Sequence, residues 1–105
     1  MAEAIVVLIT TAGAEEAQRI ADGLLEERKA ACVSIVPKVS SRFRWQGKLE
    51  KAEESLLIVK SQAKLLSQIV ELVKKHHRYE VPEIIALSIT GGNPDYLEWI
   101  AKETK

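Results

Sequence analysis

The chain has 105 residues, enough for one domain with its own hydrophobic core but short for two, so we expect a single domain over residues 1–105. Hydrophobic residues make up 47% of it, and 15 basic residues balance 15 acidic ones, which disfavours a disordered chain, a nucleic-acid binder and a membrane-surface binder. No apolar run approaches the roughly 20 residues of a bilayer span, and no signal-peptide pattern opens the sequence. We therefore expect a cytoplasmic protein.

A strand and a helix are predicted at the start of the chain. Residues 4–10 form a continuous run rich in β-branched side chains, which is typical of a central strand covered on both faces. After a break at residues 11–13, apolar residues recur at the three-and-four spacing of an amphipathic helix, so we expect a helix over residues 14–29.

A long β-hairpin is predicted next. Residues 30–45 and 48–60 read as extended arms joined at Gln46 and Gly47, where the glycine tolerates the positive φ of a tight turn. Pro37 cannot donate to a ladder, so it indicates a bulge or an edge position and a bend in the first arm. Both arms exceed the mean strand of about six residues, so we expect the tip to project and meet another subunit.

The second half of the chain predicts two helices around a fourth strand. Ser61 is a candidate cap for a helix with an apolar stripe, residues 84–90 read as a strand, and Asn93 with Pro94 is a strong helix start. The order strand, helix, strand, strand, helix, strand predicts an α+β fold, a ferredoxin-like βαββαβ sandwich with a C-terminal helix.

The adjacent histidines, His76 and His77, allow two interpretations. On a helix their side chains point about 100° apart, so they converge only if the helix ends there. The interpretation favoured by the residues alone is that they join two preceding lysines in placing positive charge at the negative end of the helix dipole. The alternative is a copper or zinc site that adds Glu80 and Glu83, or the Cys32 thiolate.

The Arg-Phe-Arg-Trp run at residues 42–45 also has two interpretations. Basic and aromatic side chains in a sheet can stack single-stranded bases, but the glycine-aromatic signature of RNA-binding sheets is absent. Glu50, Glu53 and Glu54 on the returning arm favour a cross-strand ladder of ion pairs instead. We therefore expect no nucleic-acid partner.

No catalytic motif stands out. The sequence has no nucleophile with a recognisable base, no phosphate-binding glycine loop and no metalloprotease spacing, so we do not expect an enzyme. Cys32 lies between two apolar residues in an extended segment, where a free cysteine is most often a small buried hydrophobe.

Several blocks that follow one another along nearly the whole chain carry a family resemblance. They are Ala31-Cys32-Val33 followed by Pro37, the block Arg44-Trp45-Gln46-Gly47-Lys48-Leu49-Glu50, Lys60, His77 with Tyr79-Glu80-Val81-Pro82-Glu83-Ile84, and Tyr96-Leu97-Glu98-Trp99-Ile100. Together these blocks resemble the CutA family of divalent-cation tolerance proteins.

The resemblance implies a homotrimer of ferredoxin-like subunits, in which the hairpins extend neighbouring sheets and a cleft lies between subunits. Members are associated with tolerance to divalent cations, and copper binding is attributed to some of them, so the implied cofactor is copper or another divalent cation. The resemblance places this copper binding on the histidine pair, His76 and His77, and on a first-strand cysteine, and we add Glu80 and Glu83 of the same loop as candidate metal ligands. The residues implied for a ligand in the subunit cleft are Cys32, Trp45, Glu54, Lys60 and Tyr79.

Two positions depart from the family pattern. Ile9 stands where a first-strand cysteine would supply the softest copper ligand, and Arg78 stands where the family usually has proline. The leading hypothesis is a non-enzymatic homotrimeric divalent-cation tolerance protein that binds metal ions such as copper. The alternative is a signalling or scaffold trimer that binds a small anion or metabolite at the subunit cleft.

Overall fold

The computed structural model describes residues 3–105 and contains the elements in the predicted order. The strands are β1 (Ala4–Thr11), β2 (Cys32–Trp45), β3 (Lys48–Gln62) and β4 (Ile84–Ser88). The helices are α1 (Ala14–Glu26), α2 (Leu66–His76) and α3 (Pro94–Glu103), and a 3-10 turn at Ala63–Leu65 leads into α2. In the part of the chain so described, none of the helices has the length and apolar character needed to cross a membrane.

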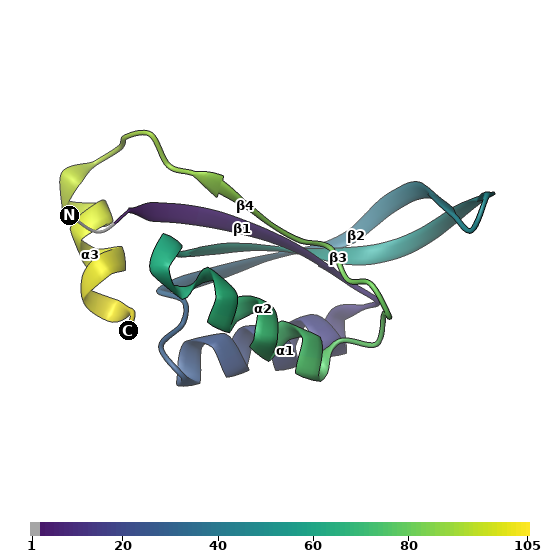
Figure 1. The fold of residues 1–105 in the computed structure, drawn as a ribbon, viewed down its shortest axis with the longest axis horizontal. Coiled ribbons are helices and arrows are strands. Elements are labelled where there is room, and N and C mark those ends of the chain that lie inside the picture. Colours follow the sequence, from purple (N-terminus) through teal and green to yellow (C-terminus); the bar gives the residue numbers. More distant parts are fainter. Residues whose placement is uncertain (1–2) are drawn as a thin grey trace.

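The four strands form one antiparallel sheet in the order β2-β3-β1-β4. Helices α1 and α2 lie side by side on one face of this sheet, and α3 packs at the end of the sheet away from the hairpin tip (Figure 1). The α+β class, the ferredoxin-like βαββαβ order and the central place of β1 are therefore confirmed.

The hydrophobic core lies between the sheet and the helices α1 and α2. Alternate residues of β1 point into it, and Val7 and Ile9 are fully buried against the helices together with Leu57 of β3. The side chains of Ile20 on α1 and Ile69 on α2 cover them. Burial of this face is the main source of stability of the subunit.

Most of the opposite face of the sheet is left uncovered by the described chain, because α3 packs only on its end, where the Gln62 side chain donates hydrogen bonds to the Ala101 carbonyl and the Thr104 hydroxyl. Register pairs Val6 with Leu87 and Leu8 with Ile85, so these residues share the face away from α1 and α2. Ile85 is 52% and Leu87 is 55% exposed. The expectation that β1 is covered on both faces is wrong for the single chain, because both long helices follow right-handed connections to the same side of the sheet.

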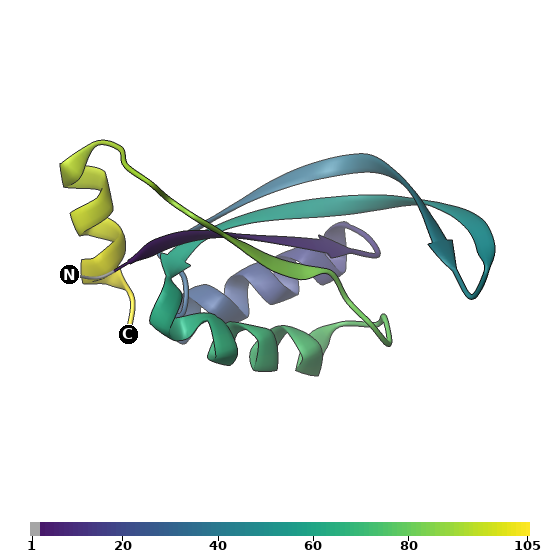
Figure 2. The ribbon, with the colours of Figure 1, turned by 45° about the horizontal axis from the view of Figure 1, so that its top comes forward.

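The hairpin has the predicted turn and bend. Gln46 and Gly47 have φ values of 52° and 81°, as a two-residue type I′ turn requires. The β2–β3 pairing shifts between Val36 and Val39, and Lys38 has a φ of 57°, so a bulge bends the first arm next to Pro37. The hairpin extends beyond the helices, and its tip bends back toward the helix-bearing side (Figure 2).

The ladder of ion pairs predicted for the hairpin is not formed. The two-residue turn places Arg42 opposite Lys51 and Arg44 opposite Leu49, so neither arginine faces a glutamate. Among residues 3–105, the ion pairs lie elsewhere, between Arg28 and Glu103 and around Glu16.

One of the two predicted helix caps is correct. The Asn93 side chain accepts a hydrogen bond from the Asp95 backbone N–H at 3.1 Å and begins α3. Ser61 instead lies in β3, where its hydroxyl donates to the Lys29 backbone carbonyl, and α2 begins without a side-chain cap. The assignment of Ser61 as a cap is therefore wrong, because its hydroxyl already has a tertiary partner.

Candidate functional site

A buried carboxylate joins two loops at one end of the helix layer. Glu16, in the first turn of α1, accepts hydrogen bonds from the backbone N–H of Ala12 at 3.0 Å and of Arg78 at 2.9 Å. Its side chain is 2% exposed, and an acidic residue in a first helical turn also suits the helix dipole. Glu16 thereby holds the loop that follows α2 against the turn that precedes α1.

The side chain of His77 lies beside Glu16 and is fully buried. Its Nε2 atom is 2.6 Å from the Thr10 carbonyl oxygen, and its Nδ1 atom accepts the Tyr79 backbone N–H at 3.1 Å. Because a carbonyl oxygen only accepts, the ring hydrogen belongs on Nε2. Both ring nitrogens of His77 are therefore occupied in holding the loop in place.

Arg78 shows how this chain tolerates its departure from the family pattern. The hydrogen bond from its backbone N–H to Glu16 is one that proline could not make. Its guanidinium Nε also lies 3.9 Å from Glu16, although the Arg78 side chain is largely exposed. The hydrogen bond to Glu16 anchors the loop, and it compensates for the loss of the rigidity that a proline ring would give.

The anchored loop directs Tyr79 toward β3. The phenol donates a hydrogen bond of 2.8 Å to Oε2 of Glu54, a carboxylate that is only 6% exposed. Burial, followed by the hydrogen bond to Glu54 and the negative charge of Glu54, raises the pKa of Tyr79 to about 12. Tyr79 therefore stays a hydrogen-bond donor to Glu54 throughout the neutral range.

The ionisation of Tyr79 tests this contact. Because its folded-state pKa of about 12 exceeds the ordinary value of 10.0, its contribution to stability is present below pH 10.0 and is lost as the pH rises to about 12. Tyrosinate absorbance should be titrated in a Tyr96→Phe background, which leaves Tyr79 as the only tyrosine. In this background we expect the absorbance change to have its midpoint near pH 12. Adding Glu54→Gln should shift that midpoint toward pH 10.0. A midpoint at pH 10.0 in the Tyr96→Phe protein with Glu54 intact would contradict the hydrogen bond between Tyr79 and Glu54.

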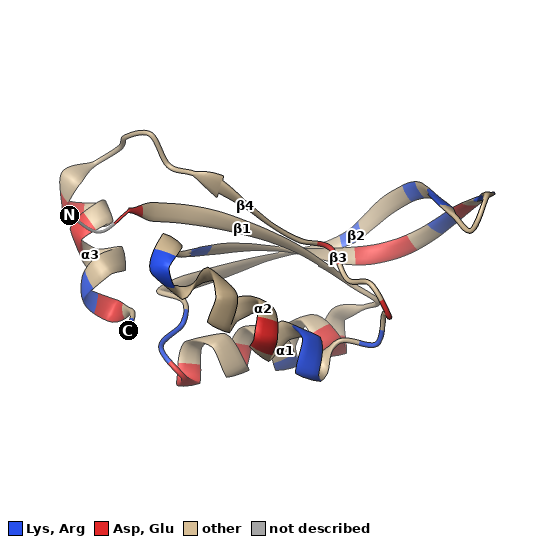
Figure 3. Ribbon diagram, in the orientation of Figure 1, with Lys and Arg blue, Asp and Glu red and all other residues tan. Residues whose placement is uncertain are grey.

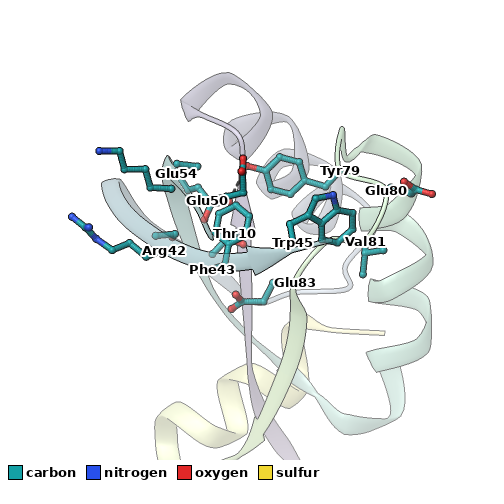
Figure 4. Close-up of a pocket in the computed structure, with 13 residues that line it drawn as sticks. Thr10, Arg42, Phe43, Trp45, Glu50, Glu54, Tyr79, Glu80, Val81 and Glu83 are labelled. Atoms are coloured by element: carbon teal, nitrogen blue, oxygen red, sulfur yellow. Dashed lines mark hydrogen bonds between the residues drawn. The ribbon is translucent and has the colours of Figure 1, made fainter. Parts of the chain in front are cut away.

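Tyr79 and Glu54 line a cavity of about 780 Å³ between the hairpin and the loop after α2. Its acidic lining residues are Glu50, Glu54, Glu80 and Glu83. Its aromatic lining residues are Phe43, Trp45 and Tyr79, and its basic ones are Arg42 and Lys51. Figure 4 shows Tyr79 and Trp45 on one side of the cavity and Phe43, Glu50 and Glu54 on another.

Strand alternation sorts these side chains between the two faces of the hairpin. Phe43 pairs with Glu50, and Glu54 lies on the same face of β3 as Glu50, whereas Arg42 and Lys51 pair with each other on the opposite face. Figure 4 accordingly shows the Arg42 guanidinium pointing away from the cavity. The face that looks into the cavity is therefore acidic and aromatic.

The residues predicted as metal ligands do not converge. His77 is buried and fully hydrogen-bonded, His76 is exposed at the end of α2, and Glu80 points away from the cavity that Glu83 lines (Figure 4). Within residues 3–105 no three His, Cys, Asp or Glu side chains are placed to hold one ion. The helix-end interpretation fits His76, which lies in a basic last turn, but not His77, whose ψ of 140° is outside the helix.

The residues predicted for the subunit cleft fall into two groups. Trp45, Glu54 and Tyr79 line the cavity together. Cys32 and Lys60 pair across β2 and β3, roughly 20 Å along β3 from Glu54. There the Lys60 Nζ atom lies 3.7 Å from Cys32 Sγ and 3.0 Å from the hydroxyl of Ser34.

Two features of Cys32 and its surroundings were not expected from the sequence. Cys32 is partly exposed rather than buried, because it belongs to the open face of an edge strand. Burial raises the pKa of Tyr96 on α3, and the neighbouring Cys32 contributes to this rise.

Glu16 is the main site residue that the sequence analysis missed. A signal for it exists, because Glu16 is the third residue of α1 after Gly13, the position from which a glutamate reaches back to backbone N–H groups in a capping box. The pattern was not recognised because Gly13 replaces the serine or threonine that normally starts the box.

Comparison with known proteins gives consistent matches over nearly the whole chain. A sequence model described as CutA1 divalent ion tolerance protein matches residues 5–103. The Divalent-cation tolerance protein CutA of Thermus thermophilus is 48% identical over 99 residues, which cover 94% of this chain and 96% of that protein.

Other relatives are longer or come from plants. Protein CutA, chloroplastic, of Arabidopsis thaliana is 44% identical over 101 residues, which cover 96% of this chain but 56% of that protein, so the chain spans about half of its length. The crystal structure of CutA1 from Oryza sativa has a TM-score of 0.96 at 44% identity and covers 99% of this chain and 95% of that one.

Proposed function

Because the chain belongs to the CutA1 family of divalent ion tolerance proteins, we propose that it is a non-enzymatic homotrimer that binds divalent cations such as copper. The observation that carries this proposal is the family match over residues 5–103, together with a bacterial relative named for divalent-cation tolerance that is matched over almost its full length.

The uncovered face of the sheet supports a trimer. Apolar side chains of β4, Ile85 and Leu87, continue the half-buried apolar face of β1, and exposed patches of this kind usually mark contacts between proteins. Figure 3 shows that β1 and β4 carry few charges, whereas charged residues follow both strands of the projecting hairpin. An apolar face beside a long hairpin is suited to packing on identical subunits.

The metal part of the proposal rests on exposed donors near the end of α2. His76 has an exposed imidazole, and Glu80 and Glu83 lie on the loop that follows. Imidazole and carboxylate suit copper and zinc, but these donors do not converge within one chain. The proposed site therefore needs ligands from a neighbouring subunit beside one of them. Residue 9 of the first strand is isoleucine, which has no sulfur to offer a metal, and its side chain is fully buried in the core.

The metal-binding proposal is tested by titrating copper(II) into metal-free protein against a competing chelator. His76→Ala should remove saturable binding, since it deletes the accessible imidazole, whereas Lys75→Ala, its exposed neighbour, should leave binding unchanged. His77 is unsuitable for this experiment because its substitution would release the loop. Absence of saturable binding in the unaltered protein would refute the metal part of the proposal.

A second function, binding of a small molecule at the cleft of the trimer, is favoured by the cavity itself. Its volume of about 780 Å³ is within the range of small-molecule sites, and Trp45, Glu54 and Tyr79 line it together. Lys60, which was expected to help hold an anion there, lies at the other end of the sheet.

A further inference from the structure

We infer that the cavity lined by Glu54, Trp45 and Tyr79 binds an organic ammonium ion, a protonated amine or a quaternary ammonium group. This inference rests on the second function above and names the chemical class of its ligand. It does not depend on metal binding.

The first argument is that Glu54 is a buried carboxylate without a counter-charge. It is 6% exposed, its Oε2 atom accepts one hydrogen bond from Tyr79, and it forms no ion pair with any of residues 3–105. Burying a carboxylate is costly unless a cation or several donors compensate it. Since Glu54 lines the cavity, a ligand inside can supply that positive charge.

The second argument is that aromatic rings surround the position of that charge. Trp45 and Tyr79 lie on one side of the cavity and Phe43 on the other (Figure 4). Aromatic faces attract alkylated ammonium groups, whose methyl and methylene groups also gain from contact with apolar surface. A carboxylate beside aromatic rings is therefore suited to an organic cation and poorly suited to a hydrated inorganic one.

The third argument concerns size and net charge. A metal ion needs several donors within about 2 to 2.6 Å, whereas the cavity has a volume of about 780 Å³ and no three-donor group was found within residues 3–105. Among the charged residues that line it, the side chains of Glu80 and Arg42 point away, which leaves the carboxylates of Glu50, Glu54 and Glu83 against the single ammonium of Lys51 (Figure 4). The surplus negative charge favours a cation over the small anion that the sequence suggested for this cleft.

The test is isothermal titration of choline and of putrescine into the full chain in chelator-treated, metal-free buffer. We expect saturable binding of at least one of them, and no binding of the neutral analogue of choline in which carbon replaces nitrogen. Glu54→Gln should weaken the affinity about tenfold or more, since it removes the charge but keeps the shape and an acceptor for Tyr79.

Glu53→Gln is the matched control, because Glu53 is the neighbouring, exposed residue on the opposite face of β3 and makes the same change in net charge. The Glu53→Gln variant should bind the organic cation with the same affinity as the unaltered protein. Glu54→Gln should also unfold at the same or a higher temperature, since it removes an uncompensated buried charge. Failure of both cations to bind, or equal weakening by both variants, would overturn the inference and leave the metal titration unaffected.

Discussion

Replacing Glu16 by alanine should lower the free energy of unfolding by about 2 to 4 kcal/mol, among the larger effects expected for a single substitution. The substitution leaves the backbone N–H groups of Ala12 and Arg78 without their acceptor and opens a void beside the buried His77 ring. Such losses are large because buried donors without partners retain their full desolvation cost.

The measurement is urea denaturation at one fixed protein concentration, since the stability of an oligomer depends on concentration. Glu15→Ala, an exposed neighbour in the same helical turn, should change the unfolding free energy by about 0.5 kcal/mol or less. If Glu16 anchors the loop, Glu16→Ala should also shift the midpoint of the Tyr79 absorbance titration toward pH 10.0. Equal stabilities of the two variants would mean that Glu16 does not hold the loop.

Replacing Leu87 by lysine should convert the proposed trimer into monomers while the subunit stays folded. Leu87 is 55% exposed in the single chain, so a lysine there is solvated in the monomer and costs little. In the trimer the same ammonium would be buried against apolar residues in three copies, and an unpaired buried charge costs several kcal/mol. The equilibrium should therefore move strongly toward the free subunit.

Sedimentation equilibrium or light scattering measures this change directly. The unaltered protein should have three times the chain mass of 11.7 kDa, and Leu87→Lys should have the mass of one chain with the circular dichroism spectrum of a folded protein. Leu25→Lys is the control, because Leu25 is 42% exposed on α1 and lies on the helix-bearing side. If the unaltered protein is a monomer, the proposed trimer is refuted. If the Leu87→Lys variant remains a trimer, Leu87 does not lie in the interface between subunits.

Features set by neighbouring residues could be predicted from the sequence. The turn at Gln46 and Gly47 follows from the backbone freedom of glycine, and the start of α3 follows from an Asn cap before Pro94. The pairing of Arg42 with Lys51 also follows from a two-residue turn by counting outward along both arms. The ion-pair ladder was therefore a mistake that the sequence itself could have prevented.

Features set by contacts between distant residues could not be predicted. Ser61 has the chemistry of a helix cap, yet its hydroxyl bonds to the Lys29 carbonyl, which only the folded chain brings near. Cys32 was expected to be buried because cysteine usually is, but an edge strand with an open face leaves it partly exposed.

The candidate site shows the same division. The sequence alone determined the α+β class, the order of elements, the hairpin and the family, because periodicity, turn residues and ordered motif blocks are read within short windows. Only the tertiary structure decided that His77 is an anchor rather than an accessible ligand, and that Glu54 meets Tyr79 while Lys60 lies far away. These outcomes depend on strand register and on the path of the loop after α2, and both are fixed by burial of the whole core.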